Sequence, residues 1–193
     1  MIAHINGKLV EKTPTYVIIE CNGLGYKVNV SLNTYEKIGS TEACKLYTEF
    51  IVRDDAQLLY GFFEEEEKRL FQMLISVSGV GAATALLVLS AGNPSEIQSA
   101  ILESNDGWFR TIKGIGTKTA QRIIIDLKDK VSKTNLEGGF LISKDNTIKE
   151  EALSALLMLG FNKNQAMKRV DKILRENKDL TVEEVVKITL KGG

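Results

Sequence analysis

Hydrophobic and polar positions divide the chain into parts with different periodicity. Up to about residue 63 the apolar residues fall in short β-branched or aromatic runs, such as Val17–Ile19 and Phe50–Val52, and Asn22-Gly23 between two runs is a hairpin turn signal. This pattern predicts five strands, near residues 2–11, 15–21, 24–31, 44–53 and 56–62, with a short helix around 34–37. Five short strands in a segment of this length are typical of a small closed barrel such as the OB-fold.

From Glu64 the period changes to that of a helix. Four glutamates, 64 to 67, precede apolar positions at Leu70, Phe71 and Leu74, and acidic residues are favourable at the start of a helix. Asn93-Pro94-Ser95-Glu96 predicts a capping box with proline at the first helical position. Helices are expected up to about Val131.

The end of the chain reads as a linker followed by a small bundle. Residues 132–148 contain Gly138-Gly139 among polar residues and lack helical periodicity, which predicts a flexible linker with one unexplained apolar patch, Phe140–Ile142. Residues 149–193 predict three short helices, the first ended by Gly160 and the other two opened by capping boxes at 162–165 and 181–184. So small a bundle suits docking better than catalysis.

These segments predict a multidomain α+β protein. The expected domains are an N-terminal OB-fold barrel (1–63), a central all-α domain (64–131), the linker (132–148) and a C-terminal three-helix bundle that resembles a ubiquitin-associated domain (149–193). A length of 193 residues is sufficient for two or three small domains.

The most specific signal is a repeat at a spacing of 35 residues. Gly79-Val80-Gly81 is repeated as Gly114-Ile115-Gly116, and in both copies an alanine follows the second glycine by four positions. This is the helix-hairpin-helix pattern, in which the glycines let a phosphate approach the main chain and the free N–H groups at the start of the second helix point at the anion. A single Gly-x-Gly is also an ordinary tight turn, but two copies in register favour phosphate binding.

Charge supports this interpretation locally. The net charge is zero, yet residues 110–133 hold seven basic residues (110, 113, 118, 122, 128, 130 and 133) against two acidic ones (126 and 129). Lys118 and Arg122 are four residues apart and therefore share a helix face. The residues predicted to bind DNA are Gly79, Val80, Gly81 and Thr84 in the first copy and Gly114, Ile115, Gly116, Thr117, Lys118 and Arg122 in the second. Contacts to phosphates carry no base information, so binding is expected to select DNA structure rather than sequence.

Several other kinds of chemistry are not expected. Gly116-Thr117-Lys118-Thr119 lacks the Gly-Lys-Thr order and the preceding strand of a P-loop, so ATP binding is excluded. Cys21 and Cys44 match no metal spacing and are expected to be buried free thiols. No cofactor, metal or catalytic residue is predicted. No signal or membrane-spanning pattern is present, which predicts a soluble cytoplasmic protein.

The order of the segments, together with Gly23-Leu24-Gly25-Tyr26 and the string from Phe50 to Phe62, resembles the RuvA family over essentially the whole chain. The resemblance implies a non-catalytic subunit that, as a homotetramer, holds open a four-way DNA junction during recombination and repair. It implies that the RuvB ATPase docks on the C-terminal bundle, for which Leu156, Leu159 and Phe161 are the candidate residues, and that the RuvC resolvase is a further partner.

The same resemblance assigns Asp54 and Asp55 to an acidic pin at the junction centre. Two positions depart from the family pattern. Asp54 stands where relatives often have glutamate, and Ala82-Ala83 stands where relatives often have a lysine, so the second hairpin is expected to dominate binding.

Two alternative functions remain open from the sequence. A helix-hairpin-helix glycosylase or lyase needs a base pocket and often an iron–sulfur cysteine cluster, which two isolated cysteines do not provide. A DNA-bound adaptor that recruits a partner through its C-terminal bundle is the second alternative. Strand cleavage or base release without a partner would favour the enzyme.

Overall fold

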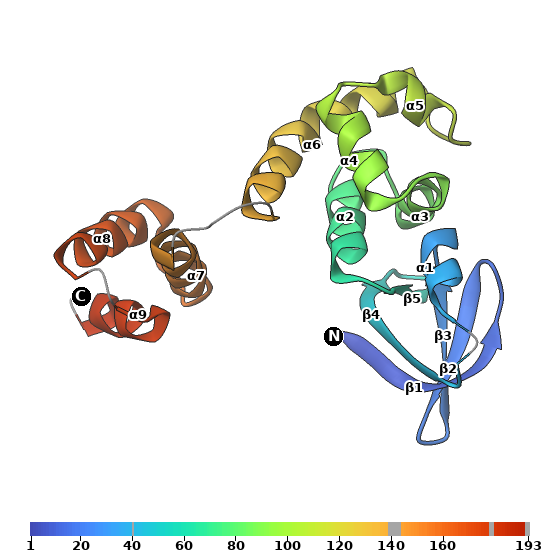
Figure 1. Cartoon of the computed structure of the whole chain (residues 1–193), viewed down its shortest axis with the longest axis horizontal. Helices are drawn as coiled ribbons and strands as arrows, with labels where there is room; N and C mark the ends of the chain where they lie inside the picture. Colours follow the sequence, from blue (N-terminus) through green and yellow to red (C-terminus); the bar gives the residue numbers. More distant parts are fainter. Residues whose placement is uncertain (40, 139–143, 178–179, 192–193) are drawn as a thin grey trace. The chain divides into compact units, whose positions relative to one another are not determined.

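The computed structural model describes residues 1–39, 41–138, 144–177 and 180–191. They separate into two compact units, Met1–Thr134 and Asn135–Gly193 (Figure 1). The first unit holds two hydrophobic clusters, one inside a barrel and one among the helices and the end of the last strand, and the second unit holds a cluster of its own. The predicted fold class, a barrel followed by a helical domain and a helical bundle, is confirmed.

The barrel consists of β1 (His4–Lys12), β2 (Tyr16–Cys21), β3 (Leu24–Val30), β4 (Ala43–Val52) and β5 (Gln57–Phe62). The strands close in the order β1-β2-β3-β5-β4, antiparallel except for the β3–β5 pair. In β2 the alternate residues Val17 and Ile19 are fully buried, as the period of a half-buried strand requires. Asn22 and Gly23 both have positive φ, which suits the tight β2–β3 hairpin. The five predicted strands and the short helix α1 (Leu32–Lys37) are therefore present.

The helical part of the first unit is a tandem of two hairpins. The first consists of α2 (Glu65–Ile75) and α3 (Ala82–Ala91), and the second of α5 (Asp106–Arg110) and α6 (Thr117–Gly138), with α4 (Pro94–Leu102) between them. The predicted capping box opens α4, because the Asn93 side chain accepts from the Glu96 N–H and the Glu96 carboxylate accepts from the Asn93 N–H.

The second unit is a three-helix bundle of α7 (Lys144–Met158), α8 (Lys163–Glu176) and α9 (Val182–Lys191). Gly160 has φ +90° and follows the end of α7, as a C-terminal glycine should. Thr181 and Glu184 form the predicted reciprocal capping box of α9. At α8 Asn162 accepts from the Asn164 N–H, a one-sided cap in place of the capping box predicted at 162–165.

Much of the range predicted as linker is helical. α6 continues to Gly138 and α7 begins at Lys144, so the helix end expected near Val131 was placed too early. Lysine, leucine and glutamate in this stretch are good helix formers, and they extend a helix that has already formed even without an apolar face. The patch Phe140–Ile142 lies outside the described residues.

Candidate nucleic-acid interface

The bends of the two hairpins have nearly the same backbone geometry. The first glycine of each, Gly79 and Gly114, adopts the left-handed region with φ of +91° and +90°. The next N–H closes a turn in both copies, from Val80 to the Val77 carbonyl at 3.0 Å and from Ile115 to the Ile112 carbonyl at 3.1 Å. A residue with a Cβ is strained in this region, so glycine is required here for the turn itself.

The apolar residue of each bend is turned into the helical core. Val80 and Ile115 are each 5% exposed, and the alanines four positions after the second glycines, Ala85 and Ala120, are fully buried. Small alanines allow the two helices of a hairpin to approach closely. The hydrophobic plug and the alanine packing inferred from the repeat are both present.

The second glycines, Gly81 and Gly116, are exposed, and the backbone conformation does not require glycine at either position. Neither has a positive φ, and a Cβ built on either one would meet nothing within 4 Å. Gly81 lies at the N-cap of α3, where no side chain caps the helix, so no side chain satisfies the first N–H groups of α3. Neither the turn nor internal packing requires these two glycines, which leaves space at both helix starts for an anion to approach the backbone.

The cations predicted on α6 differ in their surroundings. Lys118 is exposed and makes no hydrogen bond or ion pair with any described residue. Arg122 is also exposed, but its Nη1 donates to the Ser78 carbonyl at 3.1 Å, which ties α6 to the bend of the first hairpin. Thr84 on α3 is half-buried, whereas Thr117 is exposed. Sequence reasoning missed the Arg122–Ser78 contact because the two residues are 44 positions apart.

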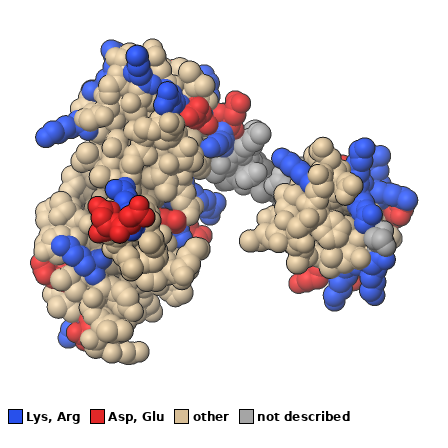
Figure 2. All heavy atoms as spheres, turned by 180° about the vertical axis from the view of Figure 1, so that it is seen from behind, with Lys and Arg blue, Asp and Glu red and all other residues tan. Residues whose placement is uncertain are grey.

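Two further cations of α6 reach loop hydroxyls. Lys128 Nζ donates to Ser104 Oγ at 2.8 Å, and Lys130 Nζ donates to Ser76 Oγ at 3.2 Å. Figure 2 shows one face of the first unit, on which Lys and Arg side chains gather at the end formed by the helical domain and an acidic cluster lies nearer the middle. The positive charge noted in the sequence is therefore concentrated on the helical domain.

Asp54 and Asp55 lie at the exposed turn between β4 and β5. The Arg53 N–H donates to the Ala56 carbonyl at 2.8 Å and closes this turn below the two carboxylates. We call the β4–β5 turn with these two residues the acidic finger. Both residues are exposed, as solvated carboxylates are.

The three residues predicted to dock a partner on the second unit are in different environments. Leu156 is fully buried in the bundle core, which corrects its assignment to a docking surface. Its place on the inner face of α7 follows from packing against α8 and α9. Phe161 is half-buried and packs against the same core, whereas Leu159 is 58% exposed. The sequence reading did not single out Met158, which is the most exposed apolar residue of this unit among those described, at 89%.

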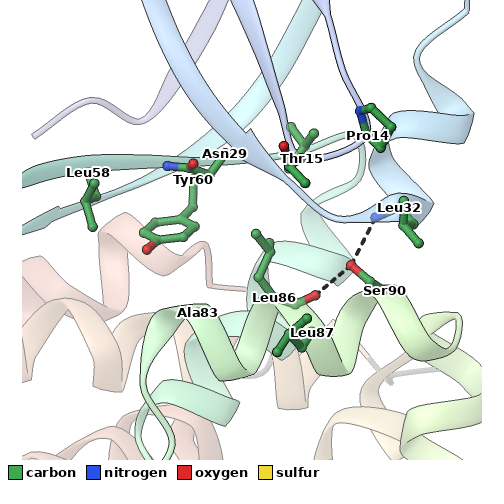
Figure 3. A pocket seen from close by; sticks show the side chains of 11 residues that line it. Pro14, Thr15, Asn29, Leu32, Leu58, Tyr60, Ala83, Leu86, Leu87 and Ser90 are labelled. Atoms are coloured by element: carbon green, nitrogen blue, oxygen red, sulfur yellow. Dashed lines mark hydrogen bonds between the residues drawn. The ribbon is translucent and has the colours of Figure 1, made fainter. Parts of the chain in front are cut away.

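An apolar groove of about 500 Å³ lies between the barrel and α3 (Figure 3). Its wall on the barrel side includes Pro14, Leu32 and Leu58, and its wall on the helix side includes Leu86 and Leu87. None of the residues that line it is charged. Leu87 and Leu32 are 47% and 42% exposed, respectively, so this groove presents apolar surface to the outside.

The two free cysteines differ in burial. Cys44 is buried, and burial raises the pKa of its thiol. Cys21 is only half-buried, and its Sγ donates to the Asn6 carbonyl, which corrects the expectation that both thiols are buried.

Within the described ranges no three His, Cys, Asp or Glu side chains are grouped to hold a metal ion, and no described helix is both long and apolar enough to cross a membrane.

A closed five-stranded barrel followed by two glycine-cornered hairpins and a separate three-helix bundle defines a tandem helix-hairpin-helix protein with an OB-type barrel. Family models match in the same order: the RuvA N terminal domain over residues 1–61, the SAM-like Helix-hairpin-helix tandem over 71–129 and the RuvA C-terminal domain over 147–192. The chain belongs to the RuvA family.

Full-length relatives agree with this assignment. The chain is 51% identical over 191 residues to a protein of Christiangramia forsetii, with 99% of each chain covered, and 52% identical over 192 residues to one of Flavobacterium psychrophilum, with 100% of each covered. It is 45% identical over 199 residues to a protein of Bacteroides fragilis, with 99% of each covered. Each of these relatives is described as a Holliday junction branch migration complex subunit RuvA. The glycosylase and adaptor alternatives are not favoured.

Proposed function

We propose that the chain is a non-catalytic subunit that binds four-way DNA junctions and couples them to the RuvB ATPase for branch migration in recombination and repair. The observation that carries this proposal is the pair of equivalent hairpins, each with an open, glycine-lined helix start. The names of the relatives, which are branch migration complex subunits, point to the same process. The cytoplasm, where bacterial DNA lies, is the proposed place of action.

Each hairpin grips one stretch of phosphate backbone. The proposed contact residues are Gly79, Val80, Gly81 and Thr84 in the first hairpin and Gly114, Ile115, Gly116, Thr117, Lys118 and Arg122 in the second. Backbone N–H groups supply most of the contacts, because the middle apolar residue of each bend is buried and offers only its main chain. Lys118 adds a free ammonium to the second hairpin alone, and Arg122 braces it against the first. The second hairpin therefore binds more tightly than the first.

The acidic finger acts by repulsion. Its two carboxylates are exposed, and they raise the energy of any phosphate that approaches the barrel at this point. At a crossover this repulsion keeps the strands apart while the hairpins hold the arms. Asp54 supplies the same charge as the glutamate often found in relatives, with a slightly shorter reach.

Four copies of the chain assemble around the junction in this proposal. A few phosphate contacts from one subunit are weak, and four linked copies multiply them through effective concentration. The uncharged groove with Leu32 and Leu87 supports contact between copies, because exposed apolar surface of this kind is usually covered. The RuvB ATPase docks on the second unit at Leu159, with Phe161 beside it, and the RuvC resolvase binds the same junction.

The test is a gel-shift comparison of a four-way junction with a linear duplex of the same sequence. We expect a clear preference for the junction and an affinity that falls steeply with salt, because each neutralised phosphate releases counterions. Equal affinity for both DNAs, or an affinity that does not respond to salt, would refute the proposal. Base release or strand cleavage by the chain alone would favour the glycosylase or lyase alternative.

A further inference from the structure

The barrel and the first hairpin meet at α1, the short helix that follows β3. Asn33 Nδ2 donates to the carbonyls of Leu89 at 2.5 Å and Gly92 at 2.7 Å, at the end of α3. The Leu32 N–H donates to Ser90 Oγ at 3.1 Å (Figure 3). These bonds join α1, which follows the barrel strand β3, to the second helix of the hairpin. We call the segment from Ser31 to Thr34, together with the side chains that it contacts, the barrel–helix joint.

A buried carboxylate lies in this joint. Glu67, in the first turn of α2, is only 2% exposed, unlike an ordinary member of a glutamate run at a helix start. Its Oε1 accepts a hydrogen bond from the Ser31 hydroxyl, and its Oε2 accepts one from the Thr34 hydroxyl at 2.6 Å. Each carboxylate oxygen therefore has its own donor, and both donors come from the segment that leaves the barrel.

The two hydroxyls also accept hydrogen bonds from the main chain. Ser31 Oγ accepts from the Thr34 N–H at 3.0 Å, and Thr34 Oγ1 accepts from the Phe63 N–H at 3.0 Å. A carboxylate can only accept, so Glu67 fixes the direction of both hydroxyls and thereby leaves their lone pairs to these N–H groups. The result is one directional network that joins α2, α1 and the end of β5.

A neutral side chain would be less costly at this place. Burial raises the pKa of Glu67, against the two hydroxyl bonds, which lower it. No Lys or Arg among the described residues bonds to Glu67; Lys37 pairs with Glu64 at 2.6 Å and lowers the pKa of Glu67 only through its charge. A buried carboxylate without a bonded cation is a net cost unless its hydrogen bonds fix something that the protein needs. These bonds add direction to the attachment of α2 to the barrel, where Tyr60 and Phe62 of β5 also pack on Phe71 of α2.

The consequence is geometric. β5 runs from the acidic finger to Phe62, and α2 begins at Glu65, so along the chain the acidic finger and the first hairpin are separated only by β5 and this short connection. We propose that Glu67 is a positioning residue for junction recognition: held by Ser31 and Thr34, it fixes the phosphate-binding hairpins relative to the acidic finger. This inference rests on the proposed junction binding.

The first test measures that geometry without DNA. Nitroxide labels are attached in the full chain at Gln57→Cys and Ala83→Cys, both exposed positions, after Cys21 and Cys44 are replaced by alanine. Labelled protein is diluted with unlabelled protein, and pulsed electron paramagnetic resonance gives the distance distribution. Glu67→Gln should broaden or shift the distribution, whereas Glu65→Gln, an exposed glutamate in the same turn, should not. An unchanged distribution in folded Glu67→Gln overturns the inference.

The second test measures selectivity in the unlabelled full chain. Glu67→Gln should lower the ratio of junction to duplex affinity about tenfold, and should leave duplex affinity within about twofold, because each hairpin keeps its own bend. Thr34→Val should reproduce this loss and Thr34→Ser should not, since serine keeps the hydroxyl. This pair also carries the test if Glu67→Gln fails to fold. Folded variants with unchanged selectivity would contradict the inference, whereas a wild-type chain without junction preference would refute the proposed function instead.

Discussion

At the scale of single residues, the two glycines of the second bend serve different physical purposes. Gly114 has φ +90°, so alanine there is strained and should lower the free energy of unfolding by about 1–2 kcal/mol. Gly116 has no positive φ and open space around it, so alanine costs only a poorer N-cap, about 0.5 kcal/mol. If a phosphate approaches the backbone at Gly116, the added Cβ should lower junction affinity about tenfold.

Urea unfolding and fluorescence anisotropy with a labelled junction separate these two effects. Gly79→Ala and Gly81→Ala provide the matched pair in the first hairpin, where the same split between stability and affinity is expected. Should Gly116→Ala bind as tightly as the wild-type chain, the helix starts would not be the phosphate sites.

Burial of Glu67 makes the stability of the fold depend on pH. Burial holds its pKa above the ordinary carboxyl value in the folded chain, and the unfolded chain returns it to that value. The folded state therefore binds the proton more tightly, so this group contributes most to stability below its unfolded pKa and loses that contribution as pH rises through the folded pKa. The free energy of unfolding of the wild type, relative to Glu67→Gln, should increase from neutral to mildly acidic pH.

Urea unfolding of both proteins at each pH measures this difference, in which the groups common to both cancel. Glu65→Gln, which removes an exposed carboxylate from the same turn of α2, serves as the control for the loss of a carboxylate at this helix start. If the free energy of unfolding of the wild type relative to Glu67→Gln fell as the pH was lowered, the carboxylate would be better solvated than its burial implies.

At the scale of helices and strands, α6 carries the cations that distinguish the two hairpins. Lys118 stands in the first turn, where a cation works against the helix dipole, so Lys118→Ala should not destabilise the fold. It should lower junction affinity and reduce the slope of log affinity against log salt by about one. Arg122→Ala should also lower affinity and, in addition, remove the bond to the Ser78 carbonyl. Both changes should weaken binding more than Thr84→Ala, since Thr84 is half-buried on the first hairpin.

Anisotropy titrations over a range of salt concentrations rank the three variants. If the second hairpin contributes more to binding, Lys118→Ala and Arg122→Ala lower junction affinity more than Thr84→Ala does. A larger loss of affinity in Thr84→Ala than in either α6 variant would mean that the first hairpin contributes more.

The strands and both bends could be predicted because their signals are local. Alternation in β2, the turn at Asn22-Gly23 and the glycine repeat all lie within a few residues of the structure that they specify. The remaining errors depend on contacts between distant segments. Leu156 and Leu159 look equivalent in the apolar run of the sequence, and only packing against α8 and α9 decides that the first is buried.

The role of Glu67 and the contact of Arg122 with Ser78 also depend on residues that are distant in the sequence, and so could not be predicted from it. Glu67 is one of four consecutive glutamates, and its partners lie 33 and 36 residues earlier in the chain. Sequence reasoning correctly placed the run at a helix start but had no signal for the one member that is buried. The continuation of α6 past Val131 is a different kind of error. The residues there have ordinary helix propensity, a local signal that the sequence does contain and that the prediction gave too little weight.

At the scale of the whole molecule, the two units have separate cores. The barrel and hairpin clusters lie within Met1–Thr134, and the cluster around Ala152 and Val170 lies within Asn135–Gly193. No residue belongs to both sets, so each unit holds the apolar contacts that it needs to fold. All residues proposed to touch DNA are in the first unit, whereas the proposed motor-docking residue Leu159 is in the second.

A chain that ends after Thr134 should therefore fold and bind a four-way junction within about twofold of the full chain, since it keeps every proposed phosphate contact and loses no core residue. It should fail to stimulate the ATPase activity of RuvB on junction DNA. Leu159→Glu in the full chain is the matched control, because it should remove the stimulation and leave both units folded. Thermal unfolding, junction titration and ATP hydrolysis measure the three quantities. If the shortened chain still stimulated RuvB, docking would belong to the first unit, and the exposed apolar residues at the end of α7 would need another partner.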